Sequence, residues 1–198
     1  MFIIKQAMTI RRIISIAALL FFSATTTDMN VDAAEDTVAE IGDAGYAPFV
    51  SADYDDIIFT DILKSVAAET KAFEVIDYAK GFLGTPYRRG SKGPKSFDCS
   101  GFTSYIFRRF DIDLGASSRS QYLDGTYIDD SDIRPGDLVF FSGRRGGKTV
   151  GHVGIAVDVA PDGRITFIHA ATSGGIRYDT YPDDGYYSNR YIGARRVF

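Results

Sequence analysis

Cysteine, histidine and positive charge are scarce in this chain of 198 residues, which has one cysteine, two histidines and no tryptophan. A single cysteine excludes an intramolecular disulfide, so the protein must be stabilised by its hydrophobic core. The 22 basic residues stand against 26 acidic ones and give a net charge of -4. This balance gives no support to nucleic-acid binding, and we expect no nucleic-acid partner.

No apolar run in the chain is long enough to span a bilayer comfortably. The run at residues 13–22 follows basic residues and has the length of a signal-peptide core. We therefore interpret residues 1–33 as a signal peptide, cleaved after Ala24 or Ala33, and expect export to the periplasm or cell envelope. An uncleaved membrane anchor is the alternative. No cysteine directly follows the run, so we expect no lipid anchor and only transient membrane association through the leader.

Basic residues are also absent between residues 35 and 61, where eight acidic residues occur. Glycines and a proline interrupt this stretch, so we interpret residues 34–70 as an acidic arm. Residues 62–83 then show a helical pattern, which ends before a glycine and a proline. Its predicted buried face carries four apolar residues, Phe73, Ile76, Ala79 and Leu83.

The C-terminal part of the chain changes to the pattern of short strands separated by Gly, Pro and Asp turns. Five strands are predicted, at residues 138–141, 152–159, 165–171, 175–181 and 191–198. Helices followed by antiparallel strands indicate an α+β domain, which we place at residues 71–198. The composition of 45% hydrophobic residues suffices for one such core.

The only cysteine stands at a predicted helix start. Asp98 is a good N-cap residue, and Phe102 and Ile106 lie one turn apart on one face, which predicts a helix over residues 99–109. Free backbone N–H groups and the positive end of the helix dipole favour the thiolate of Cys99 over the thiol. The alternative is that Cys99 is a small buried hydrophobic residue.

The two histidines are the only candidates for a neutral-pH base. His152 opens a strand directly after a glycine-rich loop, from which its side chain can project toward a helix terminus. Cysteine catalysis needs an imidazole and a third polar group that orients it. We therefore expect Cys99 as nucleophile, His152 as base and His169 as orienter. Metal binding is the alternative, but the spacing matches no zinc signature, and we expect neither a metal nor a cofactor.

The predicted strand pairing raises a difficulty for this triad. If Asp162 and Gly163 form a two-residue hairpin turn, His169 pairs opposite Ala156, which lies ~13 Å along the strand from His152. A hydrogen bond between the histidines then requires a wider loop, a bulge or strong strand coiling.

Five short motifs, taken in order, resemble the NlpC family of cell-wall cysteine peptidases. They lie at residues 83–87, 97–102, 134–141, 151–155 and 168–170. The resemblance covers roughly residues 71–198. It implies a papain-like fold, in which the nucleophile helix packs against an antiparallel sheet of about five to six strands. It also implies hydrolysis of peptide bonds in peptidoglycan by Cys99, His152 and His169.

The same resemblance places a tyrosine beside the nucleophile, at Tyr87. This residue would support the oxyanion or the substrate, or it is a loop aromatic that packs on the core. The other candidates for such support are Asp98, Ser100, Ser118 and Gln121. The chain departs from the family at residues 89–91, where relatives tend to show Trp-Gly-Gly, and lacks an arginine that they often carry before residues 117–118. Both departures fall near the predicted substrate groove.

We therefore expect an exported, monomeric cysteine endopeptidase that cuts stem or cross-link amides of peptidoglycan through an acyl-enzyme on Cys99. Its partners would be stem peptides or muropeptides. Two alternatives stay open at this point. One is a catalytically silent wall-binding module, and the other is a cysteine amidase or acyltransferase on the same fold.

Overall fold

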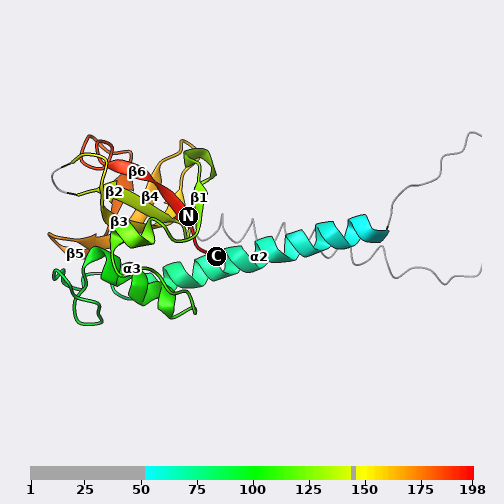
Figure 1. The fold of residues 1–198 in the computed structure, drawn as a ribbon, viewed down its shortest axis with the longest axis horizontal. Coiled ribbons are helices and arrows are strands. Elements are labelled where there is room, and N and C mark those ends of the chain that lie inside the picture. The colour runs from blue at the N-terminus through cyan, green and yellow to red at the C-terminus, as the bar shows by residue number, and fades with distance from the viewer. Residues whose placement is uncertain (1–51, 144–145) are drawn as a thin grey trace, which may run out of the picture. The chain divides into compact units, whose positions relative to one another are not determined.

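The structure is a computed structural model that describes residues 52–143 and 146–198, with side chains of the first helix described from residue 58 onward. The predicted leader and residues 34–51 of the acidic arm lie outside these residues. Within the described part the chain forms helices and six strands (Figure 1). The elements are α2 (Ala52–Lys80), α3 (Cys99–Arg108), α4 (Ser118–Gln121), β1 (Thr126–Ile128), the short 3-10 helix η1 (Asp130–Asp132), β2 (Leu138–Ser142), β3 (Val150–Val159), β4 (Ile165–Ala171), β5 (Gly175–Tyr181) and β6 (Tyr191–Arg196).

The six strands form one antiparallel sheet in the order β1-β6-β2-β3-β4-β5. Helix α3 contacts β3 and β4 and also the helix α2, while α4 contacts β3. In Figure 1, α3 lies beside the C-terminal part of α2 on one side of the sheet. This arrangement confirms the predicted α+β fold class, including the helix at Cys99 and the five predicted strands. The three-residue strand β1 was not predicted, because it is too short to show a period.

Helix α2 differs from the predicted helix at residues 62–83. It begins ten residues earlier and ends at Lys80, so it crosses into the segment interpreted as an acidic arm. The predicted buried face was wrong in part, because Phe73 is 57% exposed and Leu83 is 44% exposed. The residues that α2 buries are Ala72, Val75, Ile76 and Ala79. No helix in the described part of the chain has both the length and the apolar character needed to cross a membrane.

The sheet is buried on both faces, and strand β2 shows this most clearly. All five of its residues are buried. Leu138 and Phe140 belong to the core under α3, whereas Val139 and Phe141 belong to a second core on the opposite face. Successive strand residues point to opposite faces, so a continuous apolar run such as this one fits a strand covered on both sides. The second core is completed by aromatic residues that include Tyr187.

The β3–β4 hairpin has a wider loop and a different register from the prediction. Ala160 donates its N–H to the Arg164 carbonyl at 2.8 Å, so three residues rather than two form the loop. Val157 is then an extra residue in β3, because the register shifts between Ala156 and Asp158. Each feature moves the pairing by one residue. The predicted pairing of His169 with Ala156 was therefore wrong, and Ala156 pairs with Phe167 instead.

This register brings Gly154 opposite His169, and the close approach requires a glycine. A Cβ placed on Gly154 would lie 2.7 Å from the Phe167 ring and 3.2 Å from the His169 Cβ. Neither neighbour can retreat easily, because Phe167 and His169 are 0% and 1% exposed. The glycine thus allows β4 to bring His169 close to β3.

We expect Gly154→Ala to lower the free energy of unfolding by about 1 to 3 kcal/mol, because the added methyl group overpacks a filled site. Chemical denaturation of the purified variant measures this change. Gly143→Ala is the matched control, since a Cβ there would meet only the Gly151 Cα at 3.8 Å. Equal stability of the two variants would contradict the close packing at Gly154.

Candidate active site

The start of helix α3 is fixed by the Asp98 side chain, which confirms the predicted N-cap. Asp98 Oδ1 accepts a hydrogen bond from the Gly101 N–H at 2.6 Å, and its backbone is extended, as N-cap residues require. Asp98 Oδ2 accepts from the Gly90 N–H at 2.9 Å. One carboxylate therefore joins the helix start to the preceding loop, and Cys99 follows it as the first helical residue.

The loop at residues 84–98 packs so closely on α3 that Gly101 has no room for a side chain. A Cβ there would collide with the Ser91 carbonyl. Lys92 crosses the same region, where its Nζ donates to the Ala116 carbonyl at 2.9 Å and lies 3.6 Å from Asp98 Oδ1. These contacts hold the helix start between two loops.

The two histidines meet across β3 and β4. His152 Nε2 and His169 Nδ1 are 2.8 Å apart, and the rings are perpendicular at a centroid distance of 4.9 Å. His169 is 1% exposed and has no access to solvent. The Nε2 of His152 is thereby occupied, which leaves its Nδ1 as the ring nitrogen that can exchange a proton with another group.

A carboxylate that the sequence analysis missed continues this chain of hydrogen bonds. Asp179 Oδ2 lies 2.8 Å from His169 Nε2, and it accepts from Tyr187 Oη at 2.7 Å and from Arg177 Nη2 at 2.7 Å. Arg177 and Asp179 share one face of β5 because they are two residues apart, and Arg177 pairs directly with His169. The sequence could have indicated Asp179, because Arg177 and Asp179 alternate along the strand that follows the His169 strand. No such pattern indicated Tyr187.

The Cys99 sulfur lies against the backbone of β3, where it accepts a hydrogen bond from the N–H of Val153, the residue that follows His152. Burial and the Asp98 charge raise the pKa of Cys99, and hydrogen bonds from the N–H groups of Ser100, Val153 and Cys99 itself oppose them without prevailing. The expectation of a thiolate was therefore wrong, and the site favours the thiol. The larger cause is burial of the sulfur, and the carboxylate that caps the helix adds to it by offsetting the positive end of the helix dipole.

Burial also keeps the histidines neutral. It lowers the pKa of His152, and the nearby charge of His169 acts in the same direction, while Asp179 opposes both. Burial lowers the pKa of His169 too, against its hydrogen bond with Asp179. These pKa shifts favour a neutral thiol at Cys99 and a neutral imidazole at His152, which is the form in which His152 can act as a base.

Tyr87 lies at the same site. It forms an isolated bridge with Phe97, two residues before the nucleophile. Burial raises the pKa of Tyr87, and the charges of Cys99 and Asp98 raise it further. The structure thus brings Tyr87 to the nucleophile, with a phenol that stays protonated and can donate a hydrogen bond.

The remaining predicted support residues hold the helix rather than face a substrate. Gln121 is 0% exposed, and its amide donates to the Ser100 carbonyl at 3.0 Å and accepts from Thr103 Oγ1 at 2.8 Å. Ser118 is buried at the start of α4, and Ser100 Oγ donates to Asp98 Oδ1 at 3.2 Å. The Gln121 side chain is therefore buried and hydrogen-bonded to α3, and its support of substrate or oxyanion stays a prediction.

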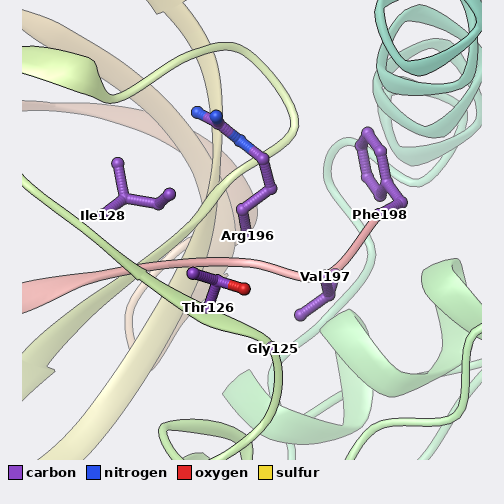
Figure 2. Close-up of a pocket in the computed structure, with 6 residues that line it drawn as sticks. All are labelled: Gly125, Thr126, Ile128, Arg196, Val197 and Phe198. Carbon is purple, nitrogen blue, oxygen red and sulfur yellow. The ribbon is translucent and has the colours of Figure 1, made fainter. Parts of the chain in front are cut away.

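The pocket in Figure 2 is a separate feature of about 440 Å³ at the β1–β6 edge and the C-terminal residues. Its lining contains none of the residues just described; it consists of Gly125, Thr126, Ile128, Arg196, Val197 and Phe198. Among the described residues no group of three or more His, Cys, Asp or Glu side chains is placed to hold a metal ion.

Comparisons with known proteins agree on one family. The pattern of the NlpC/P60 family matches residues 84–196. The probable endopeptidase NlpC of Escherichia coli (strain K12) is 38% identical over 122 residues, which cover 61% of this chain and 75% of the relative. The probable endopeptidase p60 of Listeria seeligeri is 39% identical over 123 residues, which cover 62% of this chain. The chain spans only 22% of that relative's length.

A solved structure supports the same comparison. The crystal structure of an NlpC/P60 family protein from Bacillus cereus ATCC 10987 has a TM-score of 0.57 and 32% identity to this chain. The match covers 64% of this chain and 40% of the other. This likeness and the helix packed on a six-stranded antiparallel sheet confirm the papain-like fold that the sequence predicted.

We expect the thiolate of Cys99 to form only at alkaline pH in the folded protein, with a midpoint above the ordinary thiol pKa of 9.0. Asp98→Asn keeps a capping oxygen but removes the negative charge, so this variant should titrate at lower pH than the wild type. The thiolate ultraviolet absorbance followed against pH measures both midpoints, since Cys99 is the only cysteine. A wild-type midpoint below neutral pH would contradict the neutral pair.

Proposed function

The chain belongs to the NlpC/P60 family, and from this premise we propose that it is an exported cysteine endopeptidase of peptidoglycan. Its substrates would be stem peptides or muropeptides, and its place of action the periplasm or cell envelope. The names of the relatives support endopeptidase activity, and the apolar run at residues 13–22 supports export. The observation that carries the proposal is the 2.8 Å hydrogen bond between His152 and His169 at the strand that also contacts the Cys99 sulfur.

The reaction would begin with His152 as general base. As the Cys99 sulfur attacks the amide carbon, the S–H bond breaks and the proton moves to His152 Nδ1. His152 then returns this proton to the leaving amine, and an acyl-enzyme forms on Cys99. In the second half, His152 takes a proton from the attacking water and passes it to the sulfur as the C–S bond breaks. Cys99 is then a thiol again, and the product leaves as a carboxylic acid that gives its proton to the solvent. The first half-reaction leaves a neutral His152 and an acylated Cys99, and the second returns the neutral thiol and imidazole.

The tetrahedral intermediate needs hydrogen-bond donors for its oxyanion. The backbone N–H of Cys99 at the start of α3 is one donor, because helix-start N–H groups lack intrahelical partners. Tyr87 is the second donor in this proposal. Its phenol lies near Cys99 and stays protonated, since its pKa is raised by burial and by the charges of Cys99 and Asp98.

Tyr87→Phe should lower kcat about 100-fold or more, as loss of one oxyanion donor does in other acyl-transfer enzymes, and leave the fold intact. Tyr186→Phe is the matched control, because Tyr186 is exposed and belongs to neither the helix start nor the histidine pair. Steady-state kinetics on one defined muropeptide measures both. If the two variants have the same kcat, Tyr87 is not an oxyanion donor.

The decisive test of the proposed function is incubation of the purified protein with defined muropeptides, followed by mass spectrometry of the products. Wild-type protein should release free peptide ends, and Cys99→Ala and His152→Ala should release none. Cys99→Ala removes little buried volume at a helix start, so its stability should fall by no more than about 1 to 2 kcal/mol.

Each other result points to one alternative. Muropeptide binding without cleavage by the wild type would identify a wall-binding module instead. Transfer of the acyl group to an added amine rather than to water would identify an acyltransferase. Full turnover in Cys99→Ala would show that the nucleophile lies elsewhere.

A further inference from the structure

The Asp179 carboxylate is unusual among the acidic residues of the sheet because it lies at the end of the hydrogen-bond chain that runs from His152 through His169. Its Oδ2 receives hydrogen bonds from side chains on β4, on β5 and in the segment between β5 and β6. Asp179 pairs across the strands with Phe167, and His169 pairs with Arg177, so Asp179 is the diagonal neighbour of His169. This geometry is set by the strand register and not by a flexible loop.

The chemistry of Asp179 fixes where the protons sit on both rings. Burial raises the pKa of Asp179, but hydrogen bonds from His169, Tyr187 and Arg177 outweigh it and hold the pKa far below its usual range. An ionised carboxylate can only accept hydrogen bonds, so the proton of neutral His169 must sit on Nε2. Its Nδ1 is then an acceptor. The 2.8 Å bond between the rings therefore requires a proton on His152 Nε2, which leaves His152 Nδ1 as a free lone pair.

We propose that Asp179, held in place by Arg177 and Tyr187, is a positioning residue that fixes the tautomers of His169 and His152 so that His152 Nδ1 is the basic nitrogen. The proposal deepens the proposed function and rests on it. No proton crosses to Asp179 during the reaction. The thiol proton moves to His152 Nδ1, the Nε2 proton of His152 stays in its bond to His169, and the carboxylate stabilises the resulting imidazolium through the His169 ring.

Tyr187 and Arg177 have different parts in this arrangement. Tyr187 is 7% exposed and packs edge-on against the His169 ring at a centroid distance of 5.8 Å, so its hydroxyl is fixed within the second core. Arg177 contacts Asp179 from the exposed edge, through Nε at 3.1 Å and Nη2 at 2.7 Å. With donors on several sides, the carboxylate cannot rotate away from His169 without losing bonds.

The rival explanation is that Asp179 only forms an ion pair with Arg177 that stabilises β5. The chain offers a matched control for this, because Asp162 pairs with Arg164 two residues away at 3.0 Å, at the tip of the β3–β4 hairpin. Among the described residues, Asp162 makes no hydrogen bond with either histidine. Asp162 Oδ1 also accepts from the Arg164 backbone N–H at 3.1 Å, a bond that the amide oxygen of Asp162→Asn can keep. Asp162→Asn therefore removes a carboxylate–guanidinium pair of the same sequence spacing without touching the histidines.

The test uses the full exported chain with nitrogen-15 in its histidines. The chain contains only two histidines, so all four labelled ring nitrogens belong to His152 and His169. At a pH where both rings are neutral, the wild-type NMR spectrum should show protonated Nε2 and bare Nδ1 on both rings. Asp179→Asn should give a mixture of tautomers, because an amide can present either its oxygen or its NH2 group to His169.

The kinetic arm uses one defined muropeptide. Asp179→Asn should lower kcat by at least roughly tenfold, with KM unchanged within about twofold, because substrate contacts are untouched while the base is misoriented. Asp162→Asn should match the wild type in spectrum and kcat. Tyr187→Phe, which keeps the carboxylate, should keep the wild-type tautomers and lose less kcat than Asp179→Asn.

Several results would overturn the proposal. A wild-type spectrum with the His169 proton on Nδ1 does so without any variant, and it decides the matter if Asp179→Asn fails to fold. A folded Asp179→Asn protein with either wild-type tautomers or wild-type kcat also does so. If the wild type cleaves no muropeptide, the proposed function fails instead, and the ring-nitrogen spectra alone then decide whether Asp179 sets the tautomers.

Discussion

The hydrogen bond between His152 and His169 is the constraint on which the site depends, because it joins two strands whose simplest pairing would keep these residues apart. A two-residue turn would put His169 four residues from His152 along β3. The three-residue loop and the extra residue Val157 each shift the pairing by one, which reduces the offset to two residues. At that offset long side chains on one face can meet diagonally. Gly154 then removes the side chain that would stand between them.

The face of the sheet that carries the histidines is covered by a hydrophobic core, as is the face under α3. Phe141 packs against His152, and Phe167 and Tyr187 pack against His169, at ring-centroid distances of 6.3, 5.0 and 5.8 Å. Such surroundings make an unpaired polar group costly, since a lone buried donor or acceptor loses about 1 to 3 kcal/mol of solvation. The carboxylate of Asp179 satisfies the last ring nitrogen and is itself saturated by donors. The hydrogen-bond chain from His152 through His169 to Asp179 on β5 thus also satisfies the polar groups of two buried histidines.

The features that the sequence predicted depend on short-range interactions, and those that it did not predict depend on long-range ones. The cap at Asp98, the helix after it and most strand positions depend on neighbours a few residues away, and these were predicted correctly. The hairpin register depends on one bulge and one loop residue, and neither leaves a pattern in composition. Gln121 has the motif position of a site residue, but its burial depends on how α4 docks on α3. Tyr187 reaches His169 from a turn-rich segment without any local signal.

The neutral state of the thiol has a physical cause that the helix argument alone overlooked. Asp98 caps α3 through Oδ1 and holds Gly90 through Oδ2, so a neutral amide at this position keeps the cap but loses the bond from the Gly90 N–H. The consequence suits a chain that has a single cysteine. Thiolates are the form that oxidants attack, and no second cysteine is present to resolve an oxidised sulfur by disulfide formation. In the proposed mechanism the thiol ionises only when His152 removes its proton during attack on a substrate, and it is protected at all other times. In that mechanism the tautomer of His152 governs both the reactivity and the survival of Cys99, so Asp179, at the far end of the hydrogen-bond chain, also affects Cys99.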